Sequence, residues 1–297
     1  MLALTSVTHQ LARTSLHLNG YRSRHVATAA GRVHVLETRG RGPLPPVVLL
    51  HGITSAGVHF LPLLQRLRGR VRHLYAPDML AHGFSDVPPV MRPEKMKEAM
   101  IEAMDQVVHE PSVLFGNSMG GLAAVHYALA RPERVRGVIL CSPSGAMMDE
   151  EGLRHFVRGF DFGSHDDALD FVDRLFFRRN RMRHLFAWGV RRNFSNPKMR
   201  SLLRATAPED LLRPEQLAAL RMPVLLMWGK GERILPREHY DFFRRHLPEH
   251  TRFVEPDGLG HAPYLDDAGA VARQILTFAA DVHHGRIASA ERTARAA

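Results

Sequence analysis

The sequence predicts an α/β fold in which a mostly parallel central sheet is flanked by helices. Short continuous apolar runs, typical of buried parallel strands, recur along the chain, and segments with helical periodicity alternate with them. A chain of 297 residues is also long enough to bury a sizeable core. We therefore expect one α/β domain with an insertion rather than two separate folds.

The first strands are expected to form an antiparallel hairpin. Two β-prone runs, 25–29 and 32–38, are separated by only two residues, one of them glycine. Residues 1–24 precede them and are expected to be a polar, partly helical N-terminal extension. Apolar runs at 46–50 and 71–76 are expected to be the next strands of the sheet.

The segment after these strands has a methionine stripe. Met96, Met100 and Met104 recur at helical spacing within residues 93–109, which favours a helix with a core-facing side over a cofactor contact. Asp78, in the loop after the preceding strand, is expected to be a structural hydrogen-bond acceptor rather than a catalytic group.

Ser118 lies in the most informative motif, GNSMGG at 116–121. The apolar run 112–115 precedes the motif and a helix-prone segment, 122–130, follows it. A serine on such a strand-to-helix turn stands clear of the backbone, and the helix N-terminus offers free N–H groups to a developing oxyanion. An ordinary turn between strand and helix stays open as the alternative until a base, an acid and an oxyanion loop are found.

Candidates for these partners follow three other strand-like runs. The run 46–50 ends at His51 and Gly52, which is either an oxyanion loop or a simple strand exit. Glu232 follows the run 223–228 and is either an acid or a solvated charge. His261 follows the short strand 251–256 and a glycine-rich turn, last in the order serine, acid, histidine.

With these motifs in this order, the chain resembles serine hydrolases of the α/β-hydrolase fold superfamily. Within that superfamily it resembles the esterases and lipases that have a cap domain. The resemblance covers about residues 25–282 and is carried by HG at 51–52, DMLAHGFS at 78–85, GNSMGG at 116–121, WGKGERILP at 228–236 and GH at 260–261. It implies a catalytic triad of Ser118, Glu232 and His261, with an oxyanion hole formed by the N–H groups of Ile53 and Met119. No metal and no organic cofactor is expected.

The acid position departs from the usual pattern of the family. Its loop usually carries aspartate where this chain has Glu232, although the family tolerates glutamate there. Glu232 is expected to be the acid because it occupies the post-strand loop, whereas the other nearby carboxylates follow or precede the histidine in the last loop and helix. Those carboxylates are Asp257, Asp266 and Asp267.

Residues 143–213 interrupt the alternation of strands and helices. This stretch has helical periodicity and holds eight of the 15 phenylalanines and Trp188. By resemblance it is a helical cap, which leaves 25–142 and 214–282 as the hydrolase core and 283–297 as a flexible tail. Aromatic residues in a cap favour a substrate with an acyl chain or aryl group over a sugar.

The function that the resemblance implies is cleavage of a carboxylic ester with a hydrophobic acyl or aryl group through an acyl-enzyme. One alternative is carbon–carbon bond hydrolysis of aromatic ring-fission products, but those hydrolases often carry tryptophan after the catalytic histidine, where this chain has Ala262. The other alternative is a hydrolase-fold protein that binds a ligand without catalysis.

The net charge of +10 is concentrated in one segment. Ten Lys or Arg residues and no Asp or Glu lie between Arg174 and Arg204. A positive field of this kind could attract an anionic membrane, a nucleic acid or an acidic substrate. The alternative is that the segment is a solvated basic face without a partner. No nucleic-acid-binding module is recognised, so no nucleic-acid partner is expected, and a weak contact with an anionic membrane is the macromolecular contact considered.

The single cysteine, Cys141, excludes an intramolecular disulfide and indicates a reducing compartment. The N-terminus turns polar too soon for a signal-peptide core, and no apolar run is long enough to span a bilayer. We therefore expect a cytoplasmic protein.

Overall fold

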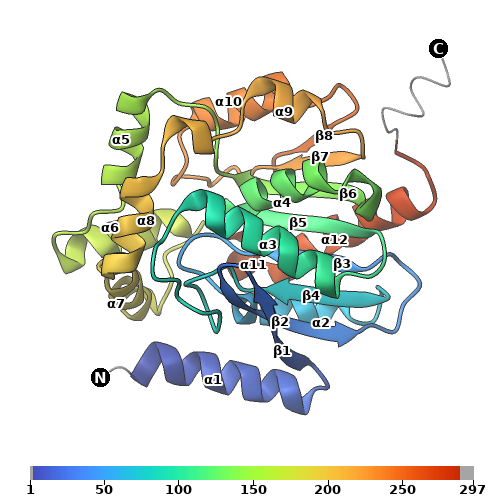
Figure 1. The fold of residues 1–297 in the computed structure, drawn as a ribbon, viewed down its shortest axis with the longest axis horizontal. Coiled ribbons are helices and arrows are strands. Elements are labelled where there is room, and N and C mark those ends of the chain that lie inside the picture. Colours follow the sequence, from blue (N-terminus) through green and yellow to red (C-terminus); the bar gives the residue numbers. More distant parts are fainter. Residues whose placement is uncertain (1–2, 288–297) are drawn as a thin grey trace.

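An eight-stranded sheet runs through the middle of the computed structural model, which describes residues 3–287 (Figure 1). The strand order is β1-β2-β4-β3-β5-β6-β7-β8. The β1–β2 and β2–β4 pairs are antiparallel and the remaining pairs are parallel. The strands are β1 (Arg22–Thr28), β2 (Gly31–Arg39), β3 (Val47–Leu50), β4 (His73–Pro77), β5 (Ser112–Ser118), β6 (Val135–Pro143), β7 (Val224–Met227) and β8 (Arg252–Val254). The predicted α/β class, with its opening hairpin, is confirmed.

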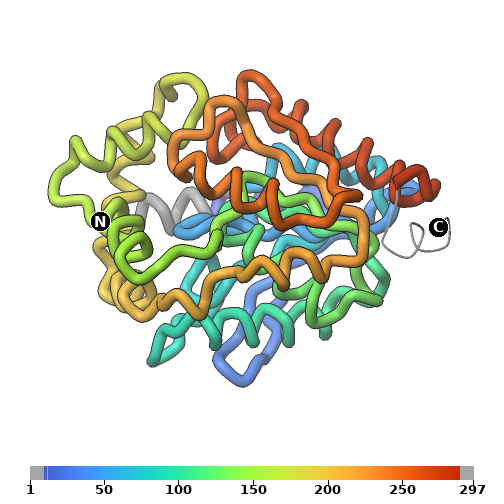
Figure 2. Tube along the Cα trace, turned by 90° about the horizontal axis from the view of Figure 1, so that it is seen from above, coloured from blue at the N-terminus to red at the C-terminus, as the bar shows by residue number. Residues whose placement is uncertain are grey.

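Helices cover both faces of this sheet. Figure 2 shows α12 and α3 on opposite sides of it. The helices are α1 (Ala3–Leu18), α2 (Leu61–Leu67), α3 (Pro93–Val107), α4 (Met119–Ala130), α5 (Glu150–Arg158), α6 (His165–Leu175), α7 (Arg183–Phe194), α8 (Pro197–Ala205), α9 (Pro214–Ala218), α10 (Arg237–His246), α11 (Pro263–Asp266) and α12 (Ala268–His283), with short 3₁₀ turns η1 (Gly57–Phe60), η2 (Pro132–Arg134) and η3 (Pro208–Asp210).

The central strands are apolar throughout because both of their faces are buried. In β3, Val48 and Leu50 belong to the core that includes α3 and α4, whereas Val47 and Leu49 belong to the core that includes α2 and α12. Successive side chains of a strand point to opposite faces, so a strand between two helical layers needs a continuous apolar run. This explains why the buried strands could be recognised in the sequence.

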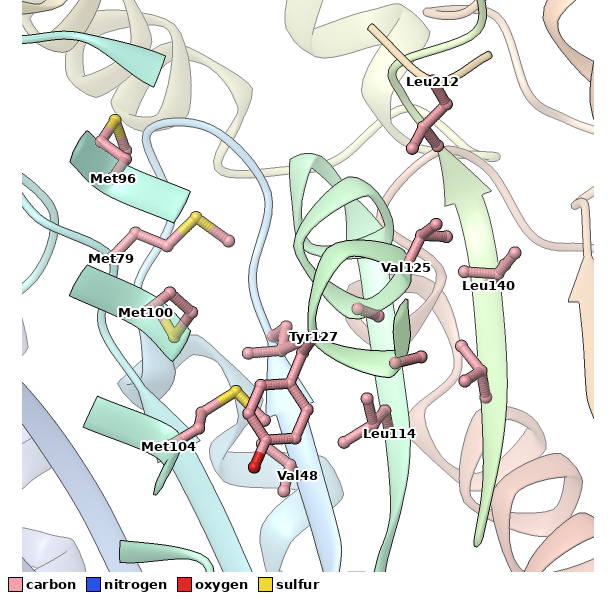
Figure 3. Packing of buried hydrophobic residues seen from close by; sticks show 14 of the residues in the cluster. Val48, Met79, Met96, Met100, Met104, Leu114, Val125, Tyr127, Leu140 and Leu212 are labelled. Carbon is pink, nitrogen blue, oxygen red and sulfur yellow. The ribbon is translucent and has the colours of Figure 1, made fainter. Parts of the chain in front are cut away.

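The methionine stripe is part of the core, as predicted. Met96, Met100 and Met104 of α3 are buried, and they belong to the same cluster as Met79 and Tyr127. Figure 3 shows the three methionine side chains on one side of α3, facing this cluster. Their unbranched side chains fill the space between α3 and α4.

Helices α5 to α8 lie between β6 and β7 in the sequence and gather at the end of the sheet where β6 ends (Figure 1). Several of their aromatic residues pack on one another. Phe194 stacks on Phe160 with ring centroids 5.2 Å apart, and it meets Phe162 at 5.4 Å and Phe171 at 6.0 Å. These four rings therefore hold the inserted helices together, while the boundary of a separate cap at 143–213 stays a prediction.

The two ends of the described chain pack on the sheet layers. In the predicted N-terminal extension, α1 contributes the fully buried Leu16. In the predicted flexible tail, Arg286 forms an ion pair with Asp281 at 2.9 Å and Ile287 is buried. The rest of that tail, 288–297, lies outside the described residues. Within residues 3–287, no helix is both long and apolar enough to cross a membrane.

Asp78 joins three parts of the fold, as expected for a structural acceptor. Its buried carboxylate accepts hydrogen bonds from the Gly57 N–H at 2.6 Å, the Phe84 N–H at 2.9 Å and His34 Nδ1 at 2.8 Å. Burial raises the pKa of Asp78, but the His34 hydrogen bond and nearby charge outweigh it, so the pKa lies below its usual 3.8.

Replacing this carboxylate should destabilise the fold. We expect Asp78→Asn to lower the free energy of unfolding by about 3 kcal/mol, because the amide replaces a buried carboxylate that accepts three hydrogen bonds. The folded pKa is below the unfolded value, so the stabilisation is complete above pH 3.8 and is lost as the pH falls through the folded value. Urea unfolding between pH 7 and 3 checks both points, with the exposed Asp241→Asn as the control. A variant as stable as wild type would contradict the assigned role.

Candidate active site

Ser118 lies on a strained turn between β5 and α4. Its backbone has φ 55° and ψ −120°, a conformation that side-chain-bearing residues rarely adopt and that is often found at functional sites. The turn leaves no space for side chains on its glycines. A Cβ on Gly116 would lie 2.2 Å from the Gly120 carbonyl oxygen, and one on Gly120 would lie 2.0 Å from that of Leu50. The GNSMGG motif therefore forms the nucleophile-elbow geometry expected for it.

Glu232 and His261 are joined by a short hydrogen bond. His261 Nδ1 lies 2.7 Å from Glu232 Oε2, and the other carboxylate oxygen accepts from the N–H groups of Ile234 at 2.7 Å and Leu235 at 3.0 Å. Burial raises the pKa of Glu232, but the charge and hydrogen bond of His261 and the Leu235 N–H lower it to about 2. Glu232 is therefore an ionised acceptor at neutral pH, and Nδ1 is the nitrogen that carries the proton. Nε2 is left as the basic nitrogen.

Asn117 ties the histidine loop to the serine strand, a link that the sequence reasoning missed. Its buried Nδ2 donates to the carbonyl oxygens of His261 at 2.8 Å and Cys141 at 3.1 Å. Because Asn117 immediately precedes Ser118, these bonds fix the ends of β5, β6 and the His261 loop against one another. The signal in the sequence was an asparagine immediately before Ser118, at the end of a strand that was expected to be buried.

His51 shapes the loop that faces the serine. Its Nδ1 donates to the Gly52 carbonyl oxygen at 2.8 Å and its Nε2 accepts from the Met79 N–H at 3.0 Å. Burial lowers the pKa of His51, which keeps the ring neutral and able to make both bonds. A Cβ on Gly52 would lie 3.2 Å from Ser118 Cβ, so this loop rests directly on the elbow.

The two predicted oxyanion donors flank this contact. Ile53 follows Gly52 in the loop, and Met119 is the first residue of α4. The first N–H groups of a helix have no carbonyl partner within it, which leaves the Met119 N–H available. The location suits both donors, and their joint role as an oxyanion hole stays a prediction.

The other carboxylates near His261 have structural partners. Asp257 forms an ion pair with Lys230 at 2.9 Å, and its side chain is 81% exposed. Asp266 accepts from the Gly260 N–H, and Asp267 caps α12 through the Ala270 N–H. Since Glu232 is almost fully buried, the alternative of a solvated surface charge is wrong for it.

The described residues hold no group of three or more His, Cys, Asp or Glu side chains arranged to bind a metal ion. The chemistry that the arrangement supports is nucleophilic. It combines a serine on a strand-to-helix turn, an imidazole bonded to a buried carboxylate, and a loop that contacts the serine at Gly52.

Comparisons with known proteins agree with this geometry. A family model described as the alpha/beta hydrolase fold matches residues 45–268. The chain is also similar to a pimeloyl-(acyl-carrier protein) methyl ester esterase from Yersinia enterocolitica serotype O:8, with 29% identity over 250 residues, 78% of this chain and 92% of that protein. An esterase of the same name from Xanthomonas campestris pv. campestris (strain B100) is 29% identical over 269 residues, 82% of this chain and 98% of that protein.

Among solved structures, naproxen esterase (carboxylesterase NP) from Bacillus subtilis has a similar fold. The TM-score is 0.71 at 19% sequence identity, and the match covers 94% of this chain and 99% of that one. At this level of identity the likeness concerns the fold.

Proposed function

Because the chain belongs to the α/β-hydrolase fold family, we propose that it is a serine hydrolase that cleaves a carboxylic ester through an acyl-enzyme. One observation carries the proposal. The buried Glu232 carboxylate binds His261 Nδ1 at 2.7 Å, at the same end of the sheet as the Ser118 elbow. That arrangement leaves one imidazole nitrogen free to act as a general base.

The mechanism follows from these positions. Ser118 Oγ attacks the ester carbonyl carbon while His261 Nε2 takes the serine proton, and the resulting oxyanion is held by the N–H groups of Ile53 and Met119. Collapse of the intermediate breaks the ester bond, and His261 returns the proton to the departing alcohol. Water then attacks the acyl-enzyme by the same route and releases the acid. Glu232 remains ionised and stabilises the imidazolium.

The inserted helices support a hydrophobic acyl or aryl group in the substrate. Helices α5 to α8 gather at the end of the sheet that carries the site, so we propose that 143–213 acts as a cap over it. Carbon–carbon bond hydrolysis is less well supported, since Ala262 and Pro263 follow His261. The ester proposal also agrees with the two relatives, both named as methyl ester esterases.

The basic segment supports a second element of the proposal, an acidic carrier for the acyl group. Both relatives are named for a substrate on acyl-carrier protein. Asp173 pairs with Arg183 at 2.9 Å and Asp161 pairs with Arg200 at 3.1 Å, which neutralises part of the charge. Within residues 3–287, the exposed Arg178 and Arg181 have no ion-pair partner within 4.0 Å. We propose that they attract an acidic partner, with an anionic membrane as the alternative.

Removal of the nucleophile tests the proposed function directly. We expect Ser118→Ala to lower kcat for p-nitrophenyl and methyl esters by several powers of ten, because no other hydroxyl occupies the elbow. A fluorophosphonate should label wild-type protein at Ser118 and leave the variant unlabelled, as read by peptide mass spectrometry. Failure to label folded wild-type protein would favour a ligand-binding protein without catalysis.

The acid is tested by a matched pair of amide substitutions. Glu232→Gln should lower kcat by about 10³–10⁴, since the amide no longer holds the catalytic imidazole tautomer. Glu232→Asp should recover part of the rate, because the charge is kept while the side chain is one methylene shorter. Asp257→Asn is the control and should leave kcat near the wild-type value. The opposite pattern would move the acid to Asp257.

The acidic-carrier element is tested with Arg178→Gln/Arg181→Gln. We expect kcat/KM for a methyl ester borne on acyl-carrier protein to fall about tenfold relative to the same ester free in solution, and the loss to shrink at high salt. Arg41→Gln/Arg136→Gln changes the charge equally at exposed sites elsewhere. If both double variants lost kcat/KM to the same extent, the effect would reflect net charge and not a site at Arg178 and Arg181. Binding of wild type to phosphatidylglycerol vesicles at low salt, weakened only by the first pair, would support the membrane instead.

A further inference from the structure

A buried imidazole outside the candidate triad has no hydrogen-bond partner. His239, in the first turn of α10, is only 3% exposed, and neither of its ring nitrogens is bonded within the described chain. Its backbone N–H is satisfied by the Pro236 carbonyl oxygen at 3.1 Å, so the unpaired groups are those of the side chain alone.

Such a residue is costly to keep for packing. A neutral imidazole carries one N–H donor and one nitrogen acceptor, and burying both without partners loses their hydrogen bonds to water. A phenylalanine of similar shape would fill the same space without that loss. Buried polar groups in native proteins are nearly always bonded, so the ring of His239 is expected to bind something that is not part of the chain.

His239 packs against the inserted helices and lies within electrostatic range of Glu232. Its ring centroid lies 5.3 Å from that of Phe156 on α5, which in turn meets Phe160 at 5.2 Å. Phe160 lines a groove of about 690 Å³ between α5 and α8. Glu232 is close enough for its carboxylate to influence the pKa of His239.

The ring is neutral at physiological pH. Burial lowers the pKa of His239 to about 4, and the opposing effects of Glu238 and Glu232 are smaller. A neutral ring suits an uncharged oxygen. A carboxylate would gain no opposite charge from the ring, and it would be repelled by the Glu232 carboxylate.

We propose that His239 is a specificity-determining residue that hydrogen-bonds an uncharged hydroxyl or keto oxygen on the acyl chain of the ester. The inference rests on the proposed ester hydrolysis and adds the substrate class, an oxygenated acyl chain. In this arrangement the acyl chain extends from Ser118 beneath α5, and the oxygen binds beside Phe156. An acyl chain without such an oxygen leaves the imidazole unpaired.

The experiment compares methyl decanoate with a series of methyl hydroxydecanoates and oxodecanoates, in which the oxygen is moved along the chain. For one position of the oxygen on the acyl chain, wild type should have a higher kcat/KM for the oxygenated ester than for methyl decanoate. His239→Phe keeps the ring contact with Phe156 and should lower this preference about tenfold, mainly through KM. His239→Gln keeps a donor and an acceptor and should recover part of it. His246→Phe, on the same helix, is the matched control and should leave the preference unchanged.

Two further measurements separate the possible failures. His239→Phe should unfold at a temperature no lower than wild type, because it removes unpaired buried polar atoms. Binding of the free hydroxy acid to Ser118→Ala, with and without His239→Phe, is measured by calorimetry and needs no turnover. Wild type that hydrolyses no ester would overturn the proposed function, whereas the binding difference would still support His239. The inference would be overturned if wild type and His239→Phe preferred the oxygenated ester equally. It would also be overturned if His239→Phe unfolded at a clearly lower temperature than wild type.

Discussion

The close approach of α4 to β3 and β5 is the constraint on which the candidate site depends. A Cβ on Gly120 would lie 2.0 Å from the Leu50 carbonyl oxygen, so the backbone of the helix meets the backbone of the strand directly. This contact holds Ser118 at a positive φ at the carboxyl edge of the sheet. Since β5, β6, β7 and β8 run parallel, the loops that follow β7 and β8 also leave the sheet at that edge and bring Glu232 and His261 to it.

The two buried carboxylates, Asp78 and Glu232, are stabilised by the same kind of hydrogen bonds but differ in what their histidine partners bind. Asp78 and Glu232 each accept two backbone N–H groups and one histidine Nδ1, which satisfies the charge that burial would otherwise penalise. The difference lies in the histidines. His34 Nε2 is bonded to Ser23 Oγ at 2.6 Å, so both of its nitrogens are used within the fold. His261 is bonded to Glu232 through Nδ1, and Nε2, for which no hydrogen bond is found within residues 3–287, is the proposed general base.

The sequence predicted what depends on local pattern. The buried strands could be recognised because each is apolar on both faces. The turn at Ser118 could be recognised because Gly116 and Gly120 approach each other too closely for side chains, and both belong to the same short motif. It did not predict Asn117, whose bond to the His261 carbonyl joins residues 144 positions apart, nor the unpaired ring of His239. The count of ten cations between 174 and 204 overstated the free charge, because Asp173 pairs with Arg179 and Arg183, and Asp161 pairs with Arg200. Such pairings depend on side-chain distances across the fold, which periodicity does not encode.

The two proposed modes of recognition depend on forces of different range. The exposed Arg178 and Arg181, in the loop between α6 and α7, would act over about 8 Å at physiological salt and would raise the rate of encounter with an acidic partner. His239 acts only within hydrogen-bond distance and inside a dry interior, where salt has little effect and an unpaired group is costly. In this proposal the two arginines select the carrier or surface that brings the substrate, and His239 selects the acyl chain. Because the inserted segment between β6 and β7 carries both Arg178 and Arg181 and also Phe156, which packs on His239, movement of this segment relative to α10 would change both steps together.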